Sequence, residues 1–258
     1  MIIDCDPGHD DAVALLLAHR HASVLAVTTV SGNAPLVDTT RNALAVLELI
    51  DADTAVVSGA AAPLTGPGRH AAVVHGSDGL GGVTLPPPTR AVAGNEAAEF
   101  IVETLRKESD VWLVAIGPLT NVALALRRDP GIAQQVAGIA IMGGSASFGN
   151  VTRTAEFNVW ADPEAADIVF TSGAPIWMCG LNLTHQLRTT DALVDLLKSA
   201  DTIRSTFCAS LFDYLHERML ELNGERSAAL HDPCAVLTVT HPELFEFAPR
   251  AVDVELNG

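Results

Sequence analysis

Four aspartates lie within the first eleven residues of the chain, in the stretch MIIDCDPGHDD. Asp4 and Asp6 alternate along a short apolar segment, so they are expected to share one face of a strand. Asp10 and Asp11 follow a Pro-Gly turn and stand in the first turn of a predicted helix. Carboxylates that converge repel one another, and one of them would hold a proton unless a cation joined them. Their hard oxygen atoms suit Ca²⁺ or Mg²⁺.

Helix capping is the simpler explanation for part of this pattern, because a carboxylate stabilises a helix N-terminus by roughly 0.3–1 kcal/mol. Capping leaves Asp4 and Asp6 unexplained. A metal-dependent phosphotransferase is another alternative, since many begin with Asp-x-Asp, but it would want a basic residue near its phosphate. The aspartate stretch contains no Lys or Arg, and the chain has 15 Lys+Arg against 31 Asp+Glu. The sequence also lacks an EF-hand loop, a zinc spacing and a P-loop, so it favours a metal site of another kind.

Strand-like and helix-like segments alternate along the chain. Strands are predicted at residues 1–5, 24–30, 55–58, 111–116, 139–142 and 175–179. Helices are predicted at residues 11–21, 36–50, 96–107, 119–128 and 164–171, the last capped by Asp162-Pro163, with two or three more between 189 and 241. Residues 59–95, rich in Gly, Pro and His, are expected to be irregular. This order predicts an α/β fold with a mostly parallel central sheet flanked by helices, in a single domain over residues 1–258.

Polar or turn-forming residues follow most of the predicted strands. They are DPG at 6–8, SGN at 31–33, GPLTN at 117–121, MGG at 142–144 and GLN at 180–182. Because ligands of open α/β sheets bind at the carboxyl ends of the strands, these segments are expected to meet at one site. The four aspartates would then form one wall of a shared cleft.

Composition excludes several classes of protein. A formal net charge of −16 argues against a surface for nucleic acid or acidic membranes, and it is compatible with a small neutral substrate or a bound cation. No apolar run reaches the roughly 18 residues of a membrane span, and the N-terminus has no leader pattern. The cysteines at 5, 179, 208 and 234 have no paired spacing and are expected to be reduced, mostly buried thiols of a cytoplasmic protein.

The stretch DCDPGHDDA resembles the signature of the inosine–uridine nucleoside hydrolase family. Further motifs agree in order: TTVSGN at 28–33, GPLTN at 117–121, IMGG at 141–144, AEFNVWADPEAA at 155–166 and HDP at 231–233. The resemblance covers nearly the whole chain and implies a single α/β domain with its site at the C-terminal edge of the strands. It further implies a homodimer or homotetramer that hydrolyses the N-glycosidic bond of ribonucleosides with Ca²⁺, and it leaves purine or pyrimidine preference open.

The resemblance also assigns site residues position by position. The Ca²⁺ ligands would be the carboxylates of Asp6, Asp11 and Asp232, the backbone carbonyl of Thr120, and water. The ribose would be bound by Asp10, Asn33, the backbone or thioether of Met142, Asn150, Glu156 and Asn158. Without the resemblance, Asn33 is simply a turn residue, Asn158 a loop amide, Met142 a core side chain and Thr120 a helix N-cap.

Two catalytic roles follow from the same resemblance. Asp6 would accept a proton from the attacking water, whose pKa Ca²⁺ lowers. His231, beside the metal ligand Asp232, would protonate the leaving base, and His75 would lie near the base as a substrate-binding residue. The carboxylate-rich wall would stabilise an oxocarbenium-like transition state. Taken alone, a single histidine is more often structural or exposed.

The chain departs from the family pattern in three places. Gly81 stands where the family often has an aspartate, which bears on how the loop around His75 is anchored. Residues 216–228 lack the aromatic residues that often cover the base. The C-terminal VDVELNG alternates like a strand and stops at the hairpin signal Asn257-Gly258, so the family's C-terminal hairpin and helix are expected to be missing. A catalytically weak nucleoside- or ribose-binding protein of the same fold is therefore the alternative function.

Overall fold

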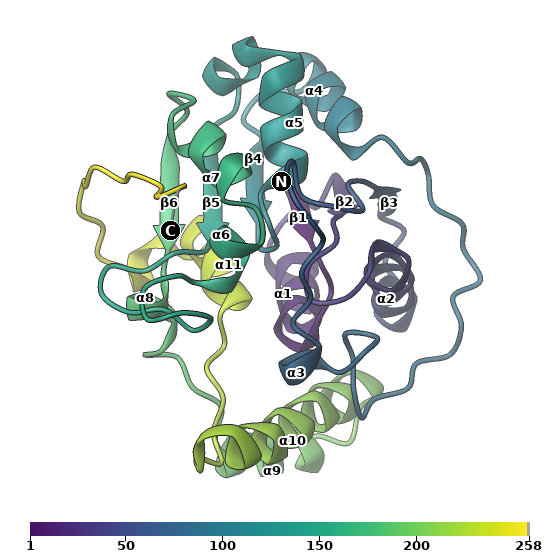
Figure 1. Ribbon diagram of the computed structural model, residues 1–258. Helices are drawn as coiled ribbons and strands as arrows, with labels where there is room; N and C mark the ends of the chain where they lie inside the picture. Colours follow the sequence, from purple (N-terminus) through teal and green to yellow (C-terminus); the bar gives the residue numbers. More distant parts are fainter. Residues whose placement is uncertain (257–258) are drawn as a thin grey trace.

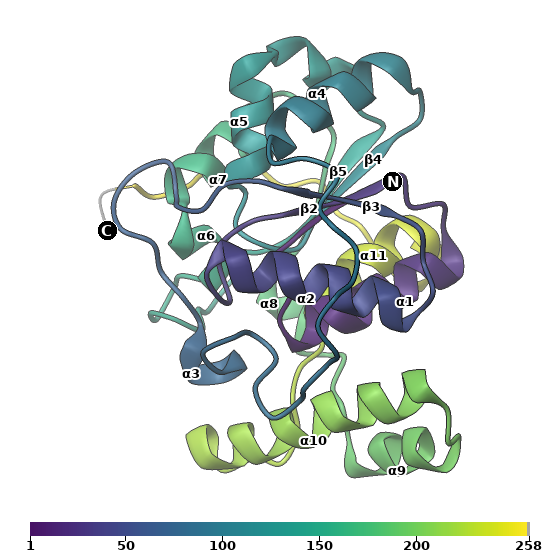
Figure 2. The same cartoon turned by 90° about the vertical axis from the view of Figure 1, so that its right-hand side faces the viewer.

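The computed structural model describes residues 1–256 (Figures 1 and 2). Within them, a six-stranded parallel sheet has the order β3-β2-β1-β4-β5-β6. Its strands are β1 (Ile2–Cys5), β2 (Ala26–Thr29), β3 (Ala55–Ser58), β4 (Trp112–Ala115), β5 (Gly138–Met142) and β6 (Ile176–Cys179). The strand order reverses between β1 and β4, which is where open α/β sheets bind their ligands. The aspartates that follow β1 therefore lie at the centre of the sheet edge.

Helices cover both faces of this sheet. They are α1 (His9–His21), α2 (Leu36–Leu49), α3 (Ala72–His75), α4 (Ala97–Lys107), α5 (Thr120–Arg128), α6 (Phe157–Ala161), α7 (Pro163–Phe170), α8 (Leu181–Thr184), α9 (Asp191–Ser199), α10 (Ile203–Asn223) and α11 (Asp232–Thr240). Figure 2 shows α4, α5 and α7 on one side of the sheet and α1, α2 and α11 on the other. Helices α9 and α10 pack together beyond the second layer (Figure 1).

Two hydrophobic cores hold these layers together. One contains Ile3 with Leu15 and Leu47 of α1 and α2, and the other contains Ile2 with Ile101 of α4. Successive residues of β1 therefore face opposite cores, as the alternation of a strand requires. Because its strands are buried on both faces, the sheet consists mainly of Ile, Val and Ala.

The predicted α/β fold with a mostly parallel sheet is confirmed. The six strands predicted between residues 1 and 179 and the five helices predicted between residues 11 and 171 are present, with ends shifted by a few residues. Residues 189–241 contain the predicted further helices. Residues 59–95, which connect β3 to α4, are irregular apart from the short α3. The short helices α3, α6 and α8 were not predicted from the sequence. They are too short to show a helical period, yet α3 carries His75 and α6 carries Asn158.

The strand predicted near the C-terminus is wrong for the residues that the structure describes. Residues 251–256 are irregular, and Asn257-Gly258, the predicted hairpin signal, lies outside the described residues. Alternation alone does not make a strand, because a strand also needs a partner for its backbone groups. Side chains hold this part of the chain instead, with Phe247 against Trp177 of β6 and Val254 against a core.

Residues 1–256 include no helix with the length and apolar character that crossing a membrane would require. The prediction for the cysteines is confirmed in so far as all of them are free and buried.

Candidate active site

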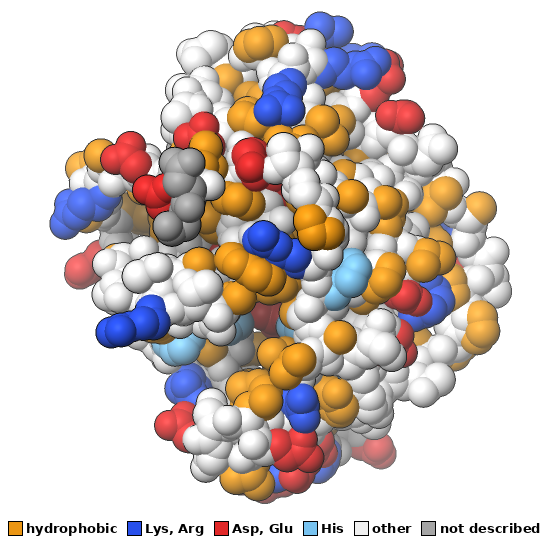
Figure 3. All heavy atoms as spheres, in the orientation of Figure 1, with side chains coloured by type: hydrophobic (Ala, Val, Ile, Leu, Met, Phe, Trp, Pro, Cys, Tyr) orange, Lys and Arg blue, Asp and Glu red, His pale blue; other side chains and the backbone are white. Residues whose placement is uncertain are grey.

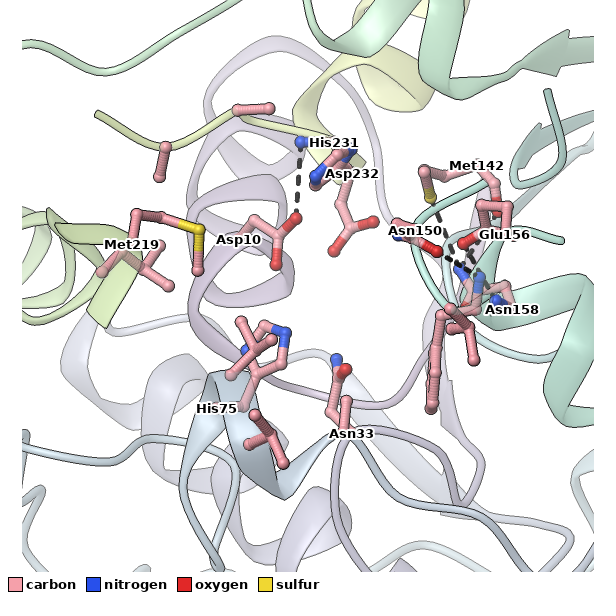
Figure 4. Close-up of a pocket in the computed structure, with 18 of the residues that line it drawn as sticks. Asp10, Asn33, His75, Met142, Asn150, Glu156, Asn158, Met219, His231 and Asp232 are labelled. Atoms are coloured by element: carbon pink, nitrogen blue, oxygen red, sulfur yellow. Dashed lines mark hydrogen bonds between the residues drawn. The ribbon is translucent and has the colours of Figure 1, made fainter. Parts of the chain in front are cut away.

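A cavity of about 590 Å³ opens at the carboxyl edge of the sheet. In the space-filling view this face is hollowed near its centre, where histidine side chains are visible (Figure 3). Figure 4 shows side chains from widely separated parts of the chain pointing into the cavity. Those labelled that were predicted as site residues are Asp10, Asn33, His75, Met142, Asn150, Glu156, Asn158, His231 and Asp232.

Asp10, Asp11 and Asp232 form a buried carboxylate cluster, in which each offers an oxygen within 4.8 Å of the others. Asp11 also fastens the start of α1, because it accepts from the N–H groups of Gly8 at 2.9 Å and Asp6 at 3.1 Å. Asp232 is the first residue of α11. Two helix N-termini thus direct carboxylates to one place, where their partial positive charge helps to hold negative charge. Capping and clustering, which were alternatives from the sequence, both occur.

Burial and mutual repulsion raise the pKa values in this cluster. Burial, followed by repulsion from Asp10, raises the pKa of Asp11 to about 6. Burial, followed by repulsion from Asp10 and Asp11, raises the pKa of Asp232 well above its usual value. A cation among the carboxylates would reverse these shifts. Since all the donors are hard oxygens, the cluster fits Ca²⁺ or Mg²⁺ better than a metal that prefers nitrogen or sulfur.

The Asp6 carboxylate lies beside Asp11 in a tightly fitted space. Its Oδ2 accepts from the Asn33 N–H at 2.6 Å, whereas Oδ1 is buried without a hydrogen-bond partner in the described chain. Glycines make the space possible, because a Cβ would lie 2.1 Å from Oδ2 at Gly32 and 2.6 Å from Oδ1 at Gly117. Burial, followed by repulsion from Asp11, raises the pKa of Asp6 well above its usual value. A buried oxygen without a partner costs about 1–3 kcal/mol, so this atom is suited to a ligand.

Asp4 does not join the cluster, which corrects the expectation that the four N-terminal aspartates converge. Its Oδ1 accepts from Thr28 Oγ1 at 2.5 Å and from Asn121 Nδ2 at 2.8 Å. Because Ile3 faces the core under α1, Asp4 faces α5, which carries Asn121. Burial raises the pKa of Asp4 to about 6, with no contribution from another carboxylate. Asp4 thus ties β1, β2 and α5 together, and of the four aspartates Asp10 alone lines the cavity.

Thr120 is the first residue of α5 and not its N-cap, which is Leu119, so the N-cap interpretation is wrong. Its Oγ1 donates to Asp162 Oδ2 at 2.6 Å, and Asp162 also caps α7, as predicted. The loop before Thr120 reaches the site, since Gly117 touches the Asp6 carboxylate. Thr120 itself is buried and does not line the cavity.

The wall of the cavity formed by α6 is polar and firmly held. Glu156 caps α6 by accepting from the N–H groups of Asn158 and Val159, and burial raises its pKa. Asn158 Nδ2 donates to the carbonyls of Ile116 at 2.9 Å and Met142 at 3.1 Å. The amide group of Asn158 is therefore oriented by two strand ends before any ligand binds.

The side chains of Asn33 and Asn150 are held by hydrogen bonds to different parts of the site. Asn33 Nδ2 donates to Asp11 Oδ2 at 3.0 Å and to the Asp6 carbonyl at 3.2 Å, so this amide belongs to the carboxylate side. Asn150 Oδ1 accepts from the Phe157 N–H at 2.9 Å at the start of α6. Both residues line the cavity.

Histidines occupy the remaining side of the cavity. His231 Nδ1 lies 2.8 Å from Thr184 Oγ1, and the His231 N–H donates to Asp10 Oδ2 at 3.4 Å. Burial lowers the pKa of His231 and also that of His75, and Asp10 opposes both shifts. A lowered pKa makes an imidazolium a stronger acid but also leaves less of it protonated at neutral pH.

Sequence reasoning missed several residues that support or line this site. Thr184, Asn121 and Thr28 hold His231 and Asp4, and His185, Arg188 and Met219 line the cavity. Asn121 and Thr28 stand within motifs that follow or end strands, so the strand-end rule could have drawn attention to them. The last three residues follow the GLN segment at 180–182 or lie within residues 216–228, but no sequence pattern marks which side chains of these segments face the cavity.

Comparison with known proteins finds similar proteins over the full length of the chain. The family model described as inosine-uridine preferring nucleoside hydrolase matches residues 1–258. The chain is 44% identical over 263 residues to the pyrimidine-specific ribonucleoside hydrolase RihA of Enterobacter sp. (strain 638). This match covers 100% of this chain and 84% of that protein. The chain is 41% identical to uridine nucleosidase 1 of Arabidopsis thaliana, over 100% of this chain and 79% of that protein.

Solved structures of the same kind superpose closely. The plant nucleoside hydrolase PpNRh1 has a TM-score of 0.96 at 36% identity, covering 100% of this chain and 83% of that one. The purine-preferring ribonucleoside hydrolase from Gardnerella vaginalis has a TM-score of 0.94 at 31% identity, covering 100% of this chain and 84% of that one.

Proposed function

This chain belongs to the inosine-uridine preferring nucleoside hydrolase family and is an N-ribosyl hydrolase, and from that premise we propose that it cleaves pyrimidine ribonucleosides, uridine foremost, with bound Ca²⁺. The products would be ribose and the free base. The observation that carries the metal part of the proposal is the buried, unpartnered Asp6 Oδ1 beside the Asp10–Asp11–Asp232 cluster.

Nucleoside hydrolases of this family depend on a metal, and the choice of Ca²⁺ is our proposal. Asp6, Asp11, Asp232 and the Thr120 carbonyl would hold the ion. Asp10 lies within the same cluster, so its carboxylate would face both the ion and the sugar. When bound, Ca²⁺ would supply positive charge that holds the ribose hydroxyls and makes a water easier to deprotonate.

Side chains of the protein would carry out the remaining steps of the reaction. Asp6 would accept the proton of the attacking water, because its carboxylate would stand beside the ion that holds this water. Asn33, Glu156 and Asn158, with Asp10, Met142 and Asn150, would hold the ribose. A sugar without its 2′-hydroxyl would leave buried polar groups unpaired, so ribose should be strongly preferred over deoxyribose. The carboxylates would also stabilise the positive charge that develops on the sugar.

The base would leave on the histidine side of the cavity. His231 would donate the proton, and His75 would contact the base. Support for pyrimidines comes from the 44% and 41% identical relatives, whose names specify pyrimidine or uridine. The lining of the α10 side by Leu215, Met219 and Leu222 agrees with this, because it offers no aromatic ring to stack on a purine.

A substrate panel with and without metal tests the proposal. Ribose release from uridine, cytidine, inosine and adenosine would be followed by a reducing-sugar assay after chelation and after return of Ca²⁺ or Mg²⁺. We expect uridine to be cleaved fastest, no turnover after chelation, and recovery with Ca²⁺. Turnover that survives complete chelation would remove the metal from the mechanism, and faster cleavage of inosine would remove the pyrimidine preference.

We also propose a homodimer or homotetramer and a cytoplasmic location in nucleoside salvage. The free buried thiols support a reducing compartment. Sedimentation of the purified protein would test the assembly, and a monomer at micromolar concentration would contradict it.

A further inference from the structure

His9 stands within the aspartate motif, yet the proposed reaction gives it no task. Its side chain is fully buried, with 0% of its surface exposed, so it reaches neither solvent nor substrate. Such a residue can act only through its neighbours.

The His9 ring contacts three segments that are distant in sequence. Its Nδ1 lies 3.1 Å from Nδ1 of His75, and the His9 N–H lies 3.3 Å from the same atom. Its Nε2 lies 3.0 Å from the carbonyl oxygen of Gly81. One face stacks on Tyr214 of α10, with ring centroids 4.8 Å apart and planes 4° from parallel. Both ring nitrogens and one face are therefore engaged.

His75 depends on these contacts for its orientation. It ends α3, a helix of four residues without a buried member and without a side-chain cap, and so short a helix does not hold a ring in place by itself. Its Nδ1 is occupied by His9, while Nε2 has no hydrogen-bond partner within residues 1–256. His75 lines the cavity, and its ring points into it (Figure 4).

We propose that His9 is a positioning residue, which holds Nδ1 of His75 toward the protein and so presents Nε2 to the base of the nucleoside. This inference rests on the proposed function. It also explains how the loop around His75 is anchored although Gly81 stands where the family often has an aspartate. The carbonyl of Gly81 and the ring of Tyr214 both contact the His9 ring.

The contacts of His9 with His75 and with Gly81 can be separated by substitution. An Asn side chain places its terminal polar atoms near the position of His Nδ1, and a Gln side chain near that of Nε2. His9→Asn therefore keeps a side-chain partner for His75 and gives up Gly81, whereas His9→Gln does the reverse. The backbone N–H of residue 9 still faces His75 Nδ1 in both variants, so the comparison isolates the contribution of the side chain. Both variants lose the stack on Tyr214 equally. His19→Asn, on the same helix but with its ring bonded to Leu15 and Thr54, is the matched control.

The experiment measures kcat and KM of these variants with uridine, together with their thermal unfolding. We expect His9→Gln to lose about 10²-fold in kcat, as a misplaced group does, His9→Asn to recover most of it, and His19→Asn to match the wild type. In a His75→Ala background, adding His9→Gln should change kcat by less than about twofold, because coupled residues are not additive.

A greater recovery with His9→Gln, or full additivity with His75→Ala, would overturn the inference and leave His9 as an anchor of the Gly81 turn. A wild-type protein without ribose release from any nucleoside would overturn the proposed function instead. If the variants do not fold, ¹⁵N NMR of the wild-type histidine rings decides: binding of uracil should shift Nε2 of His75 and leave Nδ1 in place, and the opposite pattern would contradict us.

Discussion

Replacing Gly32 with Ala tests whether the placement of the Asp6 carboxylate limits the reaction. A Cβ at residue 32 would lie 2.1 Å from Asp6 Oδ2 and 2.7 Å from Pro118 Cδ, whereas an ordinary contact begins at 3.4 Å. The Asp6 oxygen is the end of a side chain and yields more easily than the proline ring. We therefore expect the carboxylate to move by about 1 Å, which is enough to cost about 10²-fold in rate.

Stability should change much less than activity. Overpacking of a folded interior costs about 1–3 kcal/mol, and in a domain of this size each kcal/mol lowers the unfolding temperature by about 2–4 °C. The variant should therefore remain folded at the assay temperature, with a reduced kcat and a smaller change in KM for uridine. Circular dichroism at the assay temperature establishes the folded fraction against which kcat is reported.

Gly68→Ala supplies the matched control. A Cβ at Gly68 would meet only His70 Nε2 at 3.9 Å, so this variant should have wild-type activity. If folded Gly32→Ala turned over uridine within about twofold of Gly68→Ala, a shift of about 1 Å at Asp6 would not matter and the reasoning from carboxylate displacement to rate would fail.

Three further predictions concern the carboxylates and the proton donor. Asp6→Asn should lower kcat by about 10²–10⁴-fold with a smaller effect on ribose binding, and near-normal turnover in the folded variant would end the role of Asp6 as base. His231→Ala should slow uridine by about 10²-fold but leave p-nitrophenyl riboside near the wild-type rate, because that leaving group needs no proton; equal losses would make His231 a support for Asp232. Because folding raises the pKa of Asp11 from 3.8 to about 6, this group costs the metal-free protein stability as the pH rises across that range, whereas Ca²⁺ binding requires the deprotonated form. Calcium at 100 times its Kd should therefore add about 2.7 kcal/mol of stability well above pH 6 and progressively less as the pH falls through 6, and equal shifts of the unfolding temperature at both ends would contradict the site.

The fold could be predicted from the sequence because its signals are local. Buried runs such as IIDC and AVTT are bounded by turn residues, and the proline after Asp162 marks the start of α7. The motifs at the strand ends also predicted which segments would meet, since parallel strands bring their carboxyl ends to one edge. The cavity indeed gathers Asn33 and Met142 from two of these segments.

The different roles of the aspartates could not be predicted from these local signals. Alternation fixes the face of Asp4, which lies inside β1, but Asp6 lies beyond the end of the strand, where the chain turns. Only the packing of α1 against α11 brings Asp232, more than 200 residues away, to Asp10 and Asp11.

The contact between His9 and His75 could not be predicted from the sequence either, because His75 is 66 residues away on a helix too short to leave a periodic signal. A motif determines which chemical groups are available at the end of a strand. Which of them face one another, which share a proton or a cation, and which serve only as supports depends on side-chain contacts between distant segments, and these exist only once the helices have packed on the sheet.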